Sequence, residues 1–126
     1  VPLPWKRDAK NFGFGDGTPH LPQPEWFGSY SVEAEDGNPE SPLEIFRKAL
    51  KLRRELQSDE TITWHDTTRE DVLHFSRANG WNCITNFKGG NYPLPAGVVE
   101  KGQVLLSTQP LVDGKIPAGS TVWFKA

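Results

Sequence analysis

The opening stretch of this chain most constrains its fold, because residues 1–42 are rich in proline and glycine and also carry many aromatic side chains. The stretch contains seven Pro and five Gly, and its aromatic residues are Trp5, Phe12, Phe14, Trp26, Phe27 and Tyr30. Irregular stretches longer than about 12–15 residues are uncommon in compact domains unless they are functional or packed on something larger. Disordered linkers are usually poor in aromatics. We therefore expect this loop to pack, and we interpret the chain as a piece of a larger enzyme.

One amphipathic helix is predicted to follow the loop, over about residues 42–56. Ser41 is a good N-cap, Pro42 suits the first helical position, and Glu44 completes a capping box. The apolar residues recur at intervals of three and four. They form one broad face, which comprises Ile45, Phe46, Ala49, Leu50, Leu52 and Leu56.

From residue 59 onward the apolar pattern changes to a period of two, which is typical of strands. Asn79-Gly80 is a strong hairpin signal that joins the runs 72–78 and 81–87. Further short runs lie at 61–64, 98–99, 104–107 and 121–125. The absence of a second helical pattern favours a mainly β fold, a small antiparallel β-sandwich or Greek-key sheet preceded by the long irregular loop and one helix.

Composition excludes several classes of protein. The 14 basic residues are balanced by 16 acidic ones, which leaves no basic stripe for nucleic acid. The apolar runs are too short to span a membrane. A single cysteine, Cys83, allows neither an internal disulfide nor a multi-cysteine zinc site, and its place in a strand pattern predicts a small buried hydrophobe. These features favour a reducing compartment such as the cytoplasm.

The chain contains no methionine. We therefore expect it to be a piece of a longer translation product, cut at its N-terminal side.

Two motifs invite a catalytic or phosphate-binding interpretation. His65-Asp66 could orient an imidazole, but neighbours on a strand point to opposite faces, and an ordinary turn at 66–68 is the preferred interpretation. The run Gly13-Phe14-Gly15-Asp16-Gly17 resembles a phosphate-binding glycine loop. It lacks the preceding strand and the following helix that such a site needs, so a plain loop is preferred.

The ionisable clusters are also weak candidates. Glu33, Glu35 and Asp36 form a tight acidic group, and paired carboxylates serve glycoside hydrolysis at separations of about 5–9.5 Å. A solvated acidic turn before the helix is the preferred interpretation. His20, His65 and His74 lack metal-ligand spacing, and His74 is expected on a half-buried strand. The sequence therefore predicts no catalytic, cofactor-binding or metal-binding residue in this chain.

The aromatic residues of the loop leave two interpretations open. They can form a platform on which sugar rings stack, or they can pack the loop onto a protein surface. Packing is preferred because the rings are interleaved with Pro and Gly rather than set on a rigid sheet.

The order of short motifs resembles the C-terminal end of bacterial α-glucosidases of glycoside hydrolase family 13, the oligo-1,6-glucosidase and maltase type. The first half matches at Pro2-Leu3-Pro4-Trp5, Asn11-Phe12-Gly13-Phe14, Leu21-Pro22, the acidic stretch 33–36, Pro39 to Ser41 and Leu52-Arg53-Arg54. The second half matches at Leu73-His74-Phe75-Ser76-Arg77, Thr85-Asn86-Phe87, Leu105-Leu106-Ser107 and Val122-Trp123-Phe124. Two positions depart from the family: His20 stands where Trp is frequent, and the arginine of the first motif precedes Val1.

The resemblance implies a division into two parts. Residues 1–57 are the end of a (β/α)8 catalytic barrel, with the loop after strand eight and the last helix, and residues 58–126 are the C-terminal β-sandwich domain. The parent enzyme then hydrolyses terminal α-glucosidic bonds of oligosaccharides with retention, in the bacterial cytoplasm. The family's catalytic carboxylates lie on barrel strands upstream of Val1, so none is carried over to this sequence.

Other functions remain open at this stage. The chain could be a free-standing carbohydrate-binding β module or a structural interaction domain. If it is a fragment, the loop and the apolar face of the helix normally pack on the missing barrel. Exposed surfaces of this kind predict self-association, through exchange of the N-terminal arm.

Overall fold

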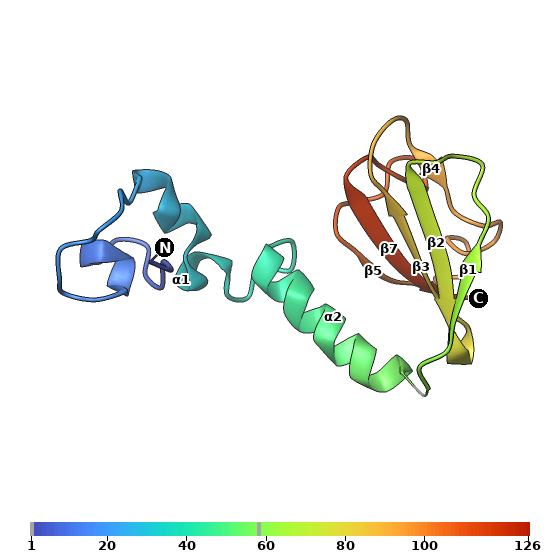
Figure 1. Cartoon of the computed structure of the whole chain (residues 1–126), viewed down its shortest axis with the longest axis horizontal. Coiled ribbons are helices and arrows are strands. Elements are labelled where there is room, and N and C mark those ends of the chain that lie inside the picture. The colour runs from blue at the N-terminus through green and yellow to red at the C-terminus, as the bar shows by residue number, and fades with distance from the viewer. Residues whose placement is uncertain (1, 58) are drawn as a thin grey trace. The chain divides into compact units, whose positions relative to one another are not determined.

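The computed structural model describes residues 2–57 and 59–126. The chain divides into two compact units, Val1–Phe46 and Arg47–Ala126 (Figure 1). The boundary predicted between residues 57 and 58 divides the chain by function, whereas these two units are defined by the contacts within each of them. Residue 58 lies outside the described residues. The assignment of 1–57 to a barrel and 58–126 to a terminal domain therefore stays a prediction.

The N-terminal unit is largely irregular, but it has an internal framework. Its three short helices are η1 (Lys10–Gly13), η2 (Glu25–Tyr30) and α1 (Val32–Glu35). The Trp5 N–H donates to the Phe12 carbonyl at 2.8 Å, and the Val32 N–H donates to the Pro4 carbonyl at 3.1 Å. A Cβ at buried Gly28 would lie 2.6 Å from a carbonyl oxygen of another segment, so only glycine allows this close passage. The loop thus packs on itself.

Helix α2 (Pro42–Leu56) has the predicted bounds. Ser41 is its N-cap, because Ser41 Oγ accepts a hydrogen bond from the Glu44 N–H at 3.2 Å. The second hydrogen bond of a capping box would run from the Ser41 N–H to the Glu44 side chain, and here both groups have other partners. The Ser41 N–H donates to the Asn38 carbonyl at 2.9 Å, and Glu44 Oε1 accepts from the Gly37 N–H at 3.1 Å. The Glu44 carboxylate therefore stabilises the turn that precedes the helix.

An antiparallel five-stranded sheet forms most of the C-terminal unit, in the order β1-β2-β3-β7-β5. Its strands are β1 (Ile62–His65), β2 (Val72–Arg77), β3 (Trp81–Asn86), β5 (Val104–Ser107) and β7 (Ser120–Lys125). A two-stranded sheet pairs β4 (Tyr92–Pro93) with β6 (Lys115–Ile116). Figure 1 shows β7, near the C-terminus, between β3 and β5. The predicted mainly β, antiparallel fold class is confirmed.

The hairpin predicted at Asn79-Gly80 joins β2 and β3, but its loop has three residues, η3 (Ala78–Gly80). Asn79 and Gly80 both have positive φ, at 63° and 72°, as tight hairpin turns require. With this loop Phe75 pairs with Cys83. A two-residue loop would shift that register by one position, and such a shift moves side chains to the opposite face of a sheet. The length of this loop therefore decides what each face presents.

The core lies on one face of the five-stranded sheet, and residues of the second sheet and its flanking loops cover it. The buried cluster comprises Val72, Ile84, Val98, Ile116, Val122 and Phe124, with Tyr92, Leu94, Val104 and Leu111 packed against it. Even-numbered positions of β2, β3 and β7 thus face inward, as the period of two requires.

The strand predicted at residues 98–99 is wrong, because these residues lie in a turn. The Lys101 N–H donates to the Gly97 carbonyl at 3.0 Å, and the Gln103 N–H donates to the Val98 carbonyl at 2.9 Å. These local bonds occupy groups that a strand ladder would need. The Val98 side chain is nevertheless buried, so the hydrophobic signal marked the core correctly and the backbone conformation incorrectly.

Candidate functional site

The face of the five-stranded sheet opposite the core carries a row of large side chains. Trp64 pairs with Phe75, Phe75 pairs with Cys83, and Cys83 pairs with Trp123. Trp81 lies two residues before Cys83 and so shares its face. We call Trp64, Phe75, Trp81 and Trp123 the aromatic row, and the side that carries them the outward face.

Neighbouring rings of the aromatic row are in contact. The ring centroids of Trp64 and Phe75 lie 5.5 Å apart, those of Phe75 and Trp81 6.2 Å, and those of Trp81 and Trp123 5.0 Å. Such separations are typical of stabilising aromatic pairs. Trp81 is buried by its neighbours, whereas Trp64, on the edge strand β1, is 60% exposed. Ile62 and Leu73 extend this exposed apolar surface.

Two hydrogen-bond donors near this row have no acceptor among the described residues. They are the indole Nε1 of Trp81 and the Nε of Arg77, and both atoms are buried. A buried donor without a partner costs about 1–3 kcal/mol. The outward face therefore presents exposed apolar rings, and the two unmet donors lie beneath its surface.

Cys83, in the centre of the outward face, is buried as predicted. Burial raises the pKa of its thiol to about 11. The thiolate is the nucleophilic form of cysteine, so Cys83 acts here as a small hydrophobe.

The core side of the edge strand brings His65 and His74 together. Their rings lie 4.4 Å apart between centroids, and His65 Nε2 lies 2.8 Å from Ser76 Oγ. Asn82 Nδ2 donates to the Gly80 carbonyl at 3.0 Å, so its Oδ1 faces His74 Nε2, also at 3.0 Å. His74 Nε2 therefore carries a hydrogen.

The His65 and Ser76 contact has the length of a base and nucleophile pair, but only part of such a site is present. A working triad needs a third group that orients the imidazole through its other nitrogen. Asp66 follows β1 in the loop, and no hydrogen bond joins it to His65 within the part of the chain that the structure describes. The pair therefore links β1 to β2. The turn expected at 66–68 is an irregular connection, with no regular structure at residues 66 and 67 and a bend at residue 68. His74 is half-buried, as predicted.

Acidification below about pH 6.5 is expected to lower the free energy of unfolding through His74. Burial lowers the pKa of His74 below its usual 6.5, the hydrogen bond with Asn82 opposes that shift, and the charge of His65 adds to it. The unfolded chain thus binds the proton more tightly, so this stability is complete above pH 6.5 and is lost as pH falls toward the lower folded pKa. Urea denaturation between pH 5 and 8 measures it. The variant His74→Gln should give a flatter profile, and an unchanged slope would contradict the prediction.

The acidic cluster is part of the framework of the N-terminal unit. Glu33 accepts a hydrogen bond from the Arg7 N–H at 2.9 Å and pairs with Lys6 Nζ at 3.3 Å. The Arg7 N–H first, and then Lys6, hold the pKa of Glu33 below its usual value. Glu35 Oε2 accepts from the Leu43 N–H at 3.0 Å, at the start of α2. The predicted acidic turn is the short helix α1, and these two carboxylates bind separate backbone groups.

In the glycine run of the N-terminal unit, two backbone carbonyl oxygens point toward one side-chain amide. Asn11 Nδ2 donates to the carbonyl oxygens of Gly15 and Gly17 at 2.7 and 2.6 Å. A phosphate site needs N–H groups that converge on the anion. Here carbonyl oxygens converge on an amide nitrogen, which supports the plain-loop interpretation.

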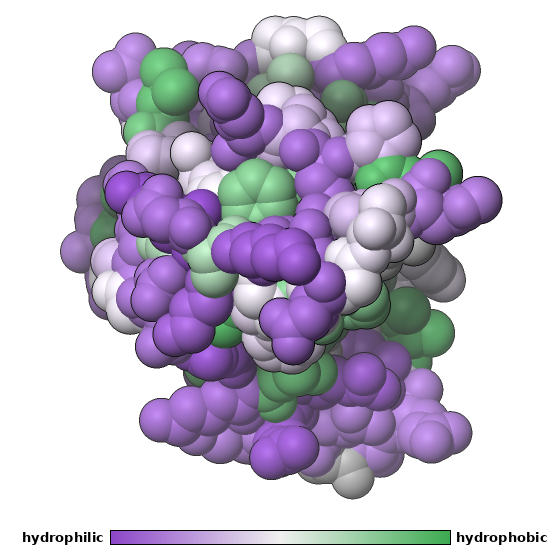
Figure 2. Space-filling model, turned by 90° about the vertical axis from the view of Figure 1, so that its left-hand side faces the viewer, coloured by the Kyte–Doolittle hydropathy of each residue, from purple (hydrophilic) through white to green (hydrophobic). Residues whose placement is uncertain are grey.

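The loop aromatics cluster within their own unit. Trp26 contacts Phe27 and Tyr30, with ring centroids 4.6 and 5.8 Å apart. Trp26 and Tyr30 remain 60% exposed, and Trp5 is also exposed. Figure 2, which faces the left-hand side of Figure 1, shows hydrophobic residues in small separate groups among hydrophilic ones.

Arg69 holds the connection between β3 and β4. Its guanidinium binds both carboxylate oxygens of Asp71, at 2.9 and 2.7 Å, and Arg69 Nη1 donates to the Gly90 carbonyl at 2.6 Å. Arg69 Nη2 also donates to the Lys88 carbonyl and, at 3.3 Å, to Asn86 Oδ1. The guanidinium of Arg69 lowers the pKa of Asp71, and the Asp71 carboxylate raises the pKa of Arg69. This network fixes loop geometry, and Arg69 and Asp71 also line a depression of about 570 Å³ together with Glu70, Phe87 and Lys88.

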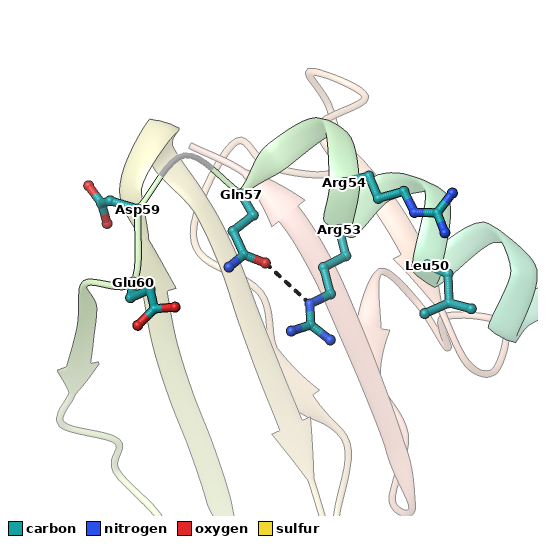
Figure 3. Close-up of a pocket in the computed structure, with 6 residues that line it drawn as sticks. All are labelled: Leu50, Arg53, Arg54, Gln57, Asp59 and Glu60. Atoms are coloured by element: carbon teal, nitrogen blue, oxygen red, sulfur yellow. Dashed lines mark hydrogen bonds between the residues drawn. The ribbon is translucent and has the colours of Figure 1, made fainter.

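A depression of about 570 Å³ lies where α2 ends. It is lined by Leu50, Arg53, Arg54, Gln57, Asp59 and Glu60. Arg53 Nε donates to Gln57 Oε1 at 3.3 Å, and the Gln57 side chain lies between Arg53 and Glu60 (Figure 3). Its lining has two arginines and two acids and suits ion pairing with a charged surface.

Within residues 2–57 and 59–126, no three His, Cys, Asp or Glu side chains gather as a metal site would require. The helices in these ranges are also too short or too polar to cross a membrane.

The chain is similar to a probable oligo-1,6-glucosidase 2 from Bacillus subtilis (strain 168). The two are 39% identical over 55 residues, which cover 44% of this chain and 10% of the relative. The matched part thus spans a tenth of that protein's length. No model of a known protein family matches the chain. The likeness relates the chain loosely to glycoside hydrolases.

Sequence reasoning missed the aromatic row. Each strand shows the alternation that places Trp64, Phe75 or Trp123 on one face, but no local pattern shows that these faces coincide. The signal would have been the number of residues in the β2–β3 loop, because that number decides which side chains of β2 and β3 share a face.

Proposed function

We propose that this chain is the non-catalytic C-terminal part of an α-glucosidase of glycoside hydrolase family 13, of the oligo-1,6-glucosidase or maltase type. Residues 1–57 form the end of the catalytic barrel, and residues 58–126 form the terminal β-sandwich domain. The parent enzyme hydrolyses terminal α-glucosidic bonds of oligosaccharides by a retaining mechanism in the bacterial cytoplasm. The chain supplies a stabilising cap on the barrel and no catalytic residue.

The 39% identity over 55 residues to a probable oligo-1,6-glucosidase carries this proposal. The structure supports it in two ways. The helix is followed by a small antiparallel sheet domain, in the order that the resemblance implies. No residue of α2 is buried, although 15-residue helices usually need a packed apolar face for stability. A helix of this kind suits the surface of a larger body.

The test is the DNA sequence upstream of the Val1 codon in the source gene. We expect an in-frame extension with an arginine codon directly before Val1 and barrel motifs with catalytic carboxylates further upstream. A start codon or a signal-peptide cleavage site directly before Val1 would overturn the proposal.

The purified chain is expected to show no turnover of an aryl α-glucoside above the uncatalysed rate. Its clustered carboxylates Glu33 and Glu35 hold backbone N–H groups rather than a shared substrate position. An authentic oligo-1,6-glucosidase is the positive control in the same assay. Turnover by the pure chain that is lost in Glu33→Gln or Glu35→Gln would contradict the prediction.

The exposed rings of Trp5 and Trp26 favour one alternative, a free-standing carbohydrate-binding module. Isothermal titration with maltose and isomaltose separates the two functions. Under our proposal the chain binds neither sugar measurably. Affinity that is lost in Trp5→Ala or Trp26→Ala would support the module.

A further inference from the structure

The turn between β2 and β3 restricts which residues can occupy its last two positions. Asn79 has a φ of 63° and Gly80 a φ of 72°, and this left-handed backbone is the one that asparagine and glycine adopt most readily. A Cβ at Gly80 would lie 2.5 Å from a backbone oxygen of Ala126, so only glycine fits there. The fold therefore places glycine directly after a residue that favours the left-handed region.

This pair of residues is also prone to one covalent reaction. The backbone nitrogen that follows an asparagine can attack the side-chain amide carbon, because the ring that closes has five members. Glycine offers the least hindered nitrogen, since it carries no Cβ. Of the six asparagines in the chain, only Asn79 precedes glycine, and it is exposed to solvent. The residue that suits the turn is thus also the most reactive asparagine of the chain.

The folded turn holds the two reacting atoms apart. Ring closure requires the Gly80 nitrogen to lie on the same side as the Asn79 Cβ, whereas the ψ of 17° at Asn79 turns that nitrogen away from it. The Gly80 carbonyl accepts hydrogen bonds from the Ala126 N–H and from Asn82 Nδ2, each at 3.0 Å. The Asn79 amide itself donates to the Leu56 carbonyl at 3.4 Å. These bonds resist the rotation about the Asn79 Cα–C bond that the reaction needs.

We propose that Asn79 is a site of spontaneous deamidation that reacts when the β2–β3 turn opens. The Gly80 nitrogen forms a bond to Asn79 Cγ, the bond between Cγ and Nδ2 breaks, and Nδ2 leaves as ammonia with the proton of the Gly80 nitrogen. Water then opens the cyclic imide and leaves aspartate or isoaspartate at position 79. This proposal is independent of the parent enzyme's activity, because it rests on contacts within the C-terminal unit.

Either product alters the turn. An aspartate at position 79 has no N–H to donate to the Leu56 carbonyl, and its charge lies at the C-terminal end of α2, where the helix dipole is negative. An isoaspartate adds a methylene group to the main chain of the loop whose length sets the β2–β3 register. A chain that has opened and reacted therefore does not recover the original turn, so position 79 records past opening.

Peptide mapping by mass spectrometry of the full chain tests the site. The chain is incubated in mildly alkaline buffer with guanidinium chloride and digested with trypsin. The peptide 78–88 contains Asn79 together with Asn82 and Asn86, which serve as internal controls. In the unfolded chain Asn79 should gain the mass of an acid about tenfold faster than either, or more, because only its attacking nitrogen belongs to glycine. Equal rates at the three asparagines would overturn the assignment.

The same incubation without denaturant tests the protection by the fold. The rate should fall by about tenfold or more in the folded chain, in proportion to the fraction of turns that are open. Equal rates with and without denaturant would overturn the proposed link to opening.

The variant Asn79→Gly is the matched control for both experiments. It keeps a residue that adopts the left-handed backbone and removes the reactive amide, and circular dichroism confirms that it is folded. Its peptide 78–88 should gain almost no mass. A gain as large as that of the wild type would show that another asparagine reacts and would overturn the proposal.

Discussion

Replacement of Phe124 by alanine is expected to lower the free energy of unfolding by about 3–5 kcal/mol. Phe124 is 1% exposed and belongs to the buried core cluster. It lies on β7, where it pairs with Asn82 of β3 and Val104 of β5. The truncation removes the largest fully buried side chain and leaves a cavity. Strand β7 is paired with a strand on each side, so it cannot shift to close that cavity. Urea denaturation followed by circular dichroism measures the loss.

The control for this prediction is the same substitution at Phe87. This residue follows β3 and is 58% exposed, so Phe87→Ala should change the free energy of unfolding by less than about 1 kcal/mol. Because small domains are stable by only about 5–15 kcal/mol, the Phe124 variant should be partly unfolded near 37 °C. Equal losses at the two positions would show that the core lies elsewhere.

Replacement of Asn86 by alanine is expected to cost about 3 kcal/mol, because it removes two donors from a buried position. Asn86 is fully buried. Its Nδ2 donates to the Ile116 carbonyl at 3.0 Å and to the Gly90 carbonyl at 3.1 Å. Its Oδ1 accepts from Arg69 at 3.3 Å. One side chain thus joins the end of β3 to β6 and to the loop that precedes β4.

The variant Asn86→Asp distinguishes the contribution of the two hydrogen bonds that Asn86 donates from that of the one that it accepts. It retains the oxygen that faces Arg69 and replaces the amide nitrogen that binds the two carbonyls. If the donors carry the stability, Asn86→Asp loses about as much as Asn86→Ala in urea denaturation. Asn91→Ala, at an exposed position, is the matched control and should be nearly neutral. An aspartate variant as stable as the wild type would show that the Arg69 contact dominates.

Elements with strong local signals were predictable. Helix α2 has a capping serine, a proline at its first position and a repeating apolar stripe, and its predicted and observed bounds coincide. The longer strands at 72–77 and 81–86 carry clear alternation and flank a turn with two left-handed residues. These signals act within a few residues, so they operate in any tertiary context.

Elements that depend on distant partners were not predictable. The short strands β4 and β6 have two residues each and exist because they pair with one another. Val98 has the composition of a strand residue but reaches the core from a turn. The helix α1 has a local N-cap at Ser31, but its first residues are held by a distant segment, because the Val32 and Glu33 N–H groups donate to the carbonyls of Pro4 and Trp5, each at 3.1 Å.

The same distinction applies to the candidate site. The sequence showed that neither the glycine run nor the acidic cluster has the context of a catalytic site, and the contacts of Asn11, Glu33 and Glu35 agree with that interpretation. It did not reveal the aromatic row, whose members come from four strands. The assignment of the chain to the end of an α-glucosidase rests on a short stretch of identity, and the gene sequence tests it.

The sequence by itself determined the helix, the main strands and the antiparallel class of the sheet, because periodicity and capping are local properties of the backbone. Only the tertiary structure decided which aromatic residues share a face. Side chains alternate along a strand, so one residue in the β2–β3 loop changes the parity of the register and reverses the faces. With the three-residue loop, Phe75 lies beside Trp64 and Trp81 on the outward face.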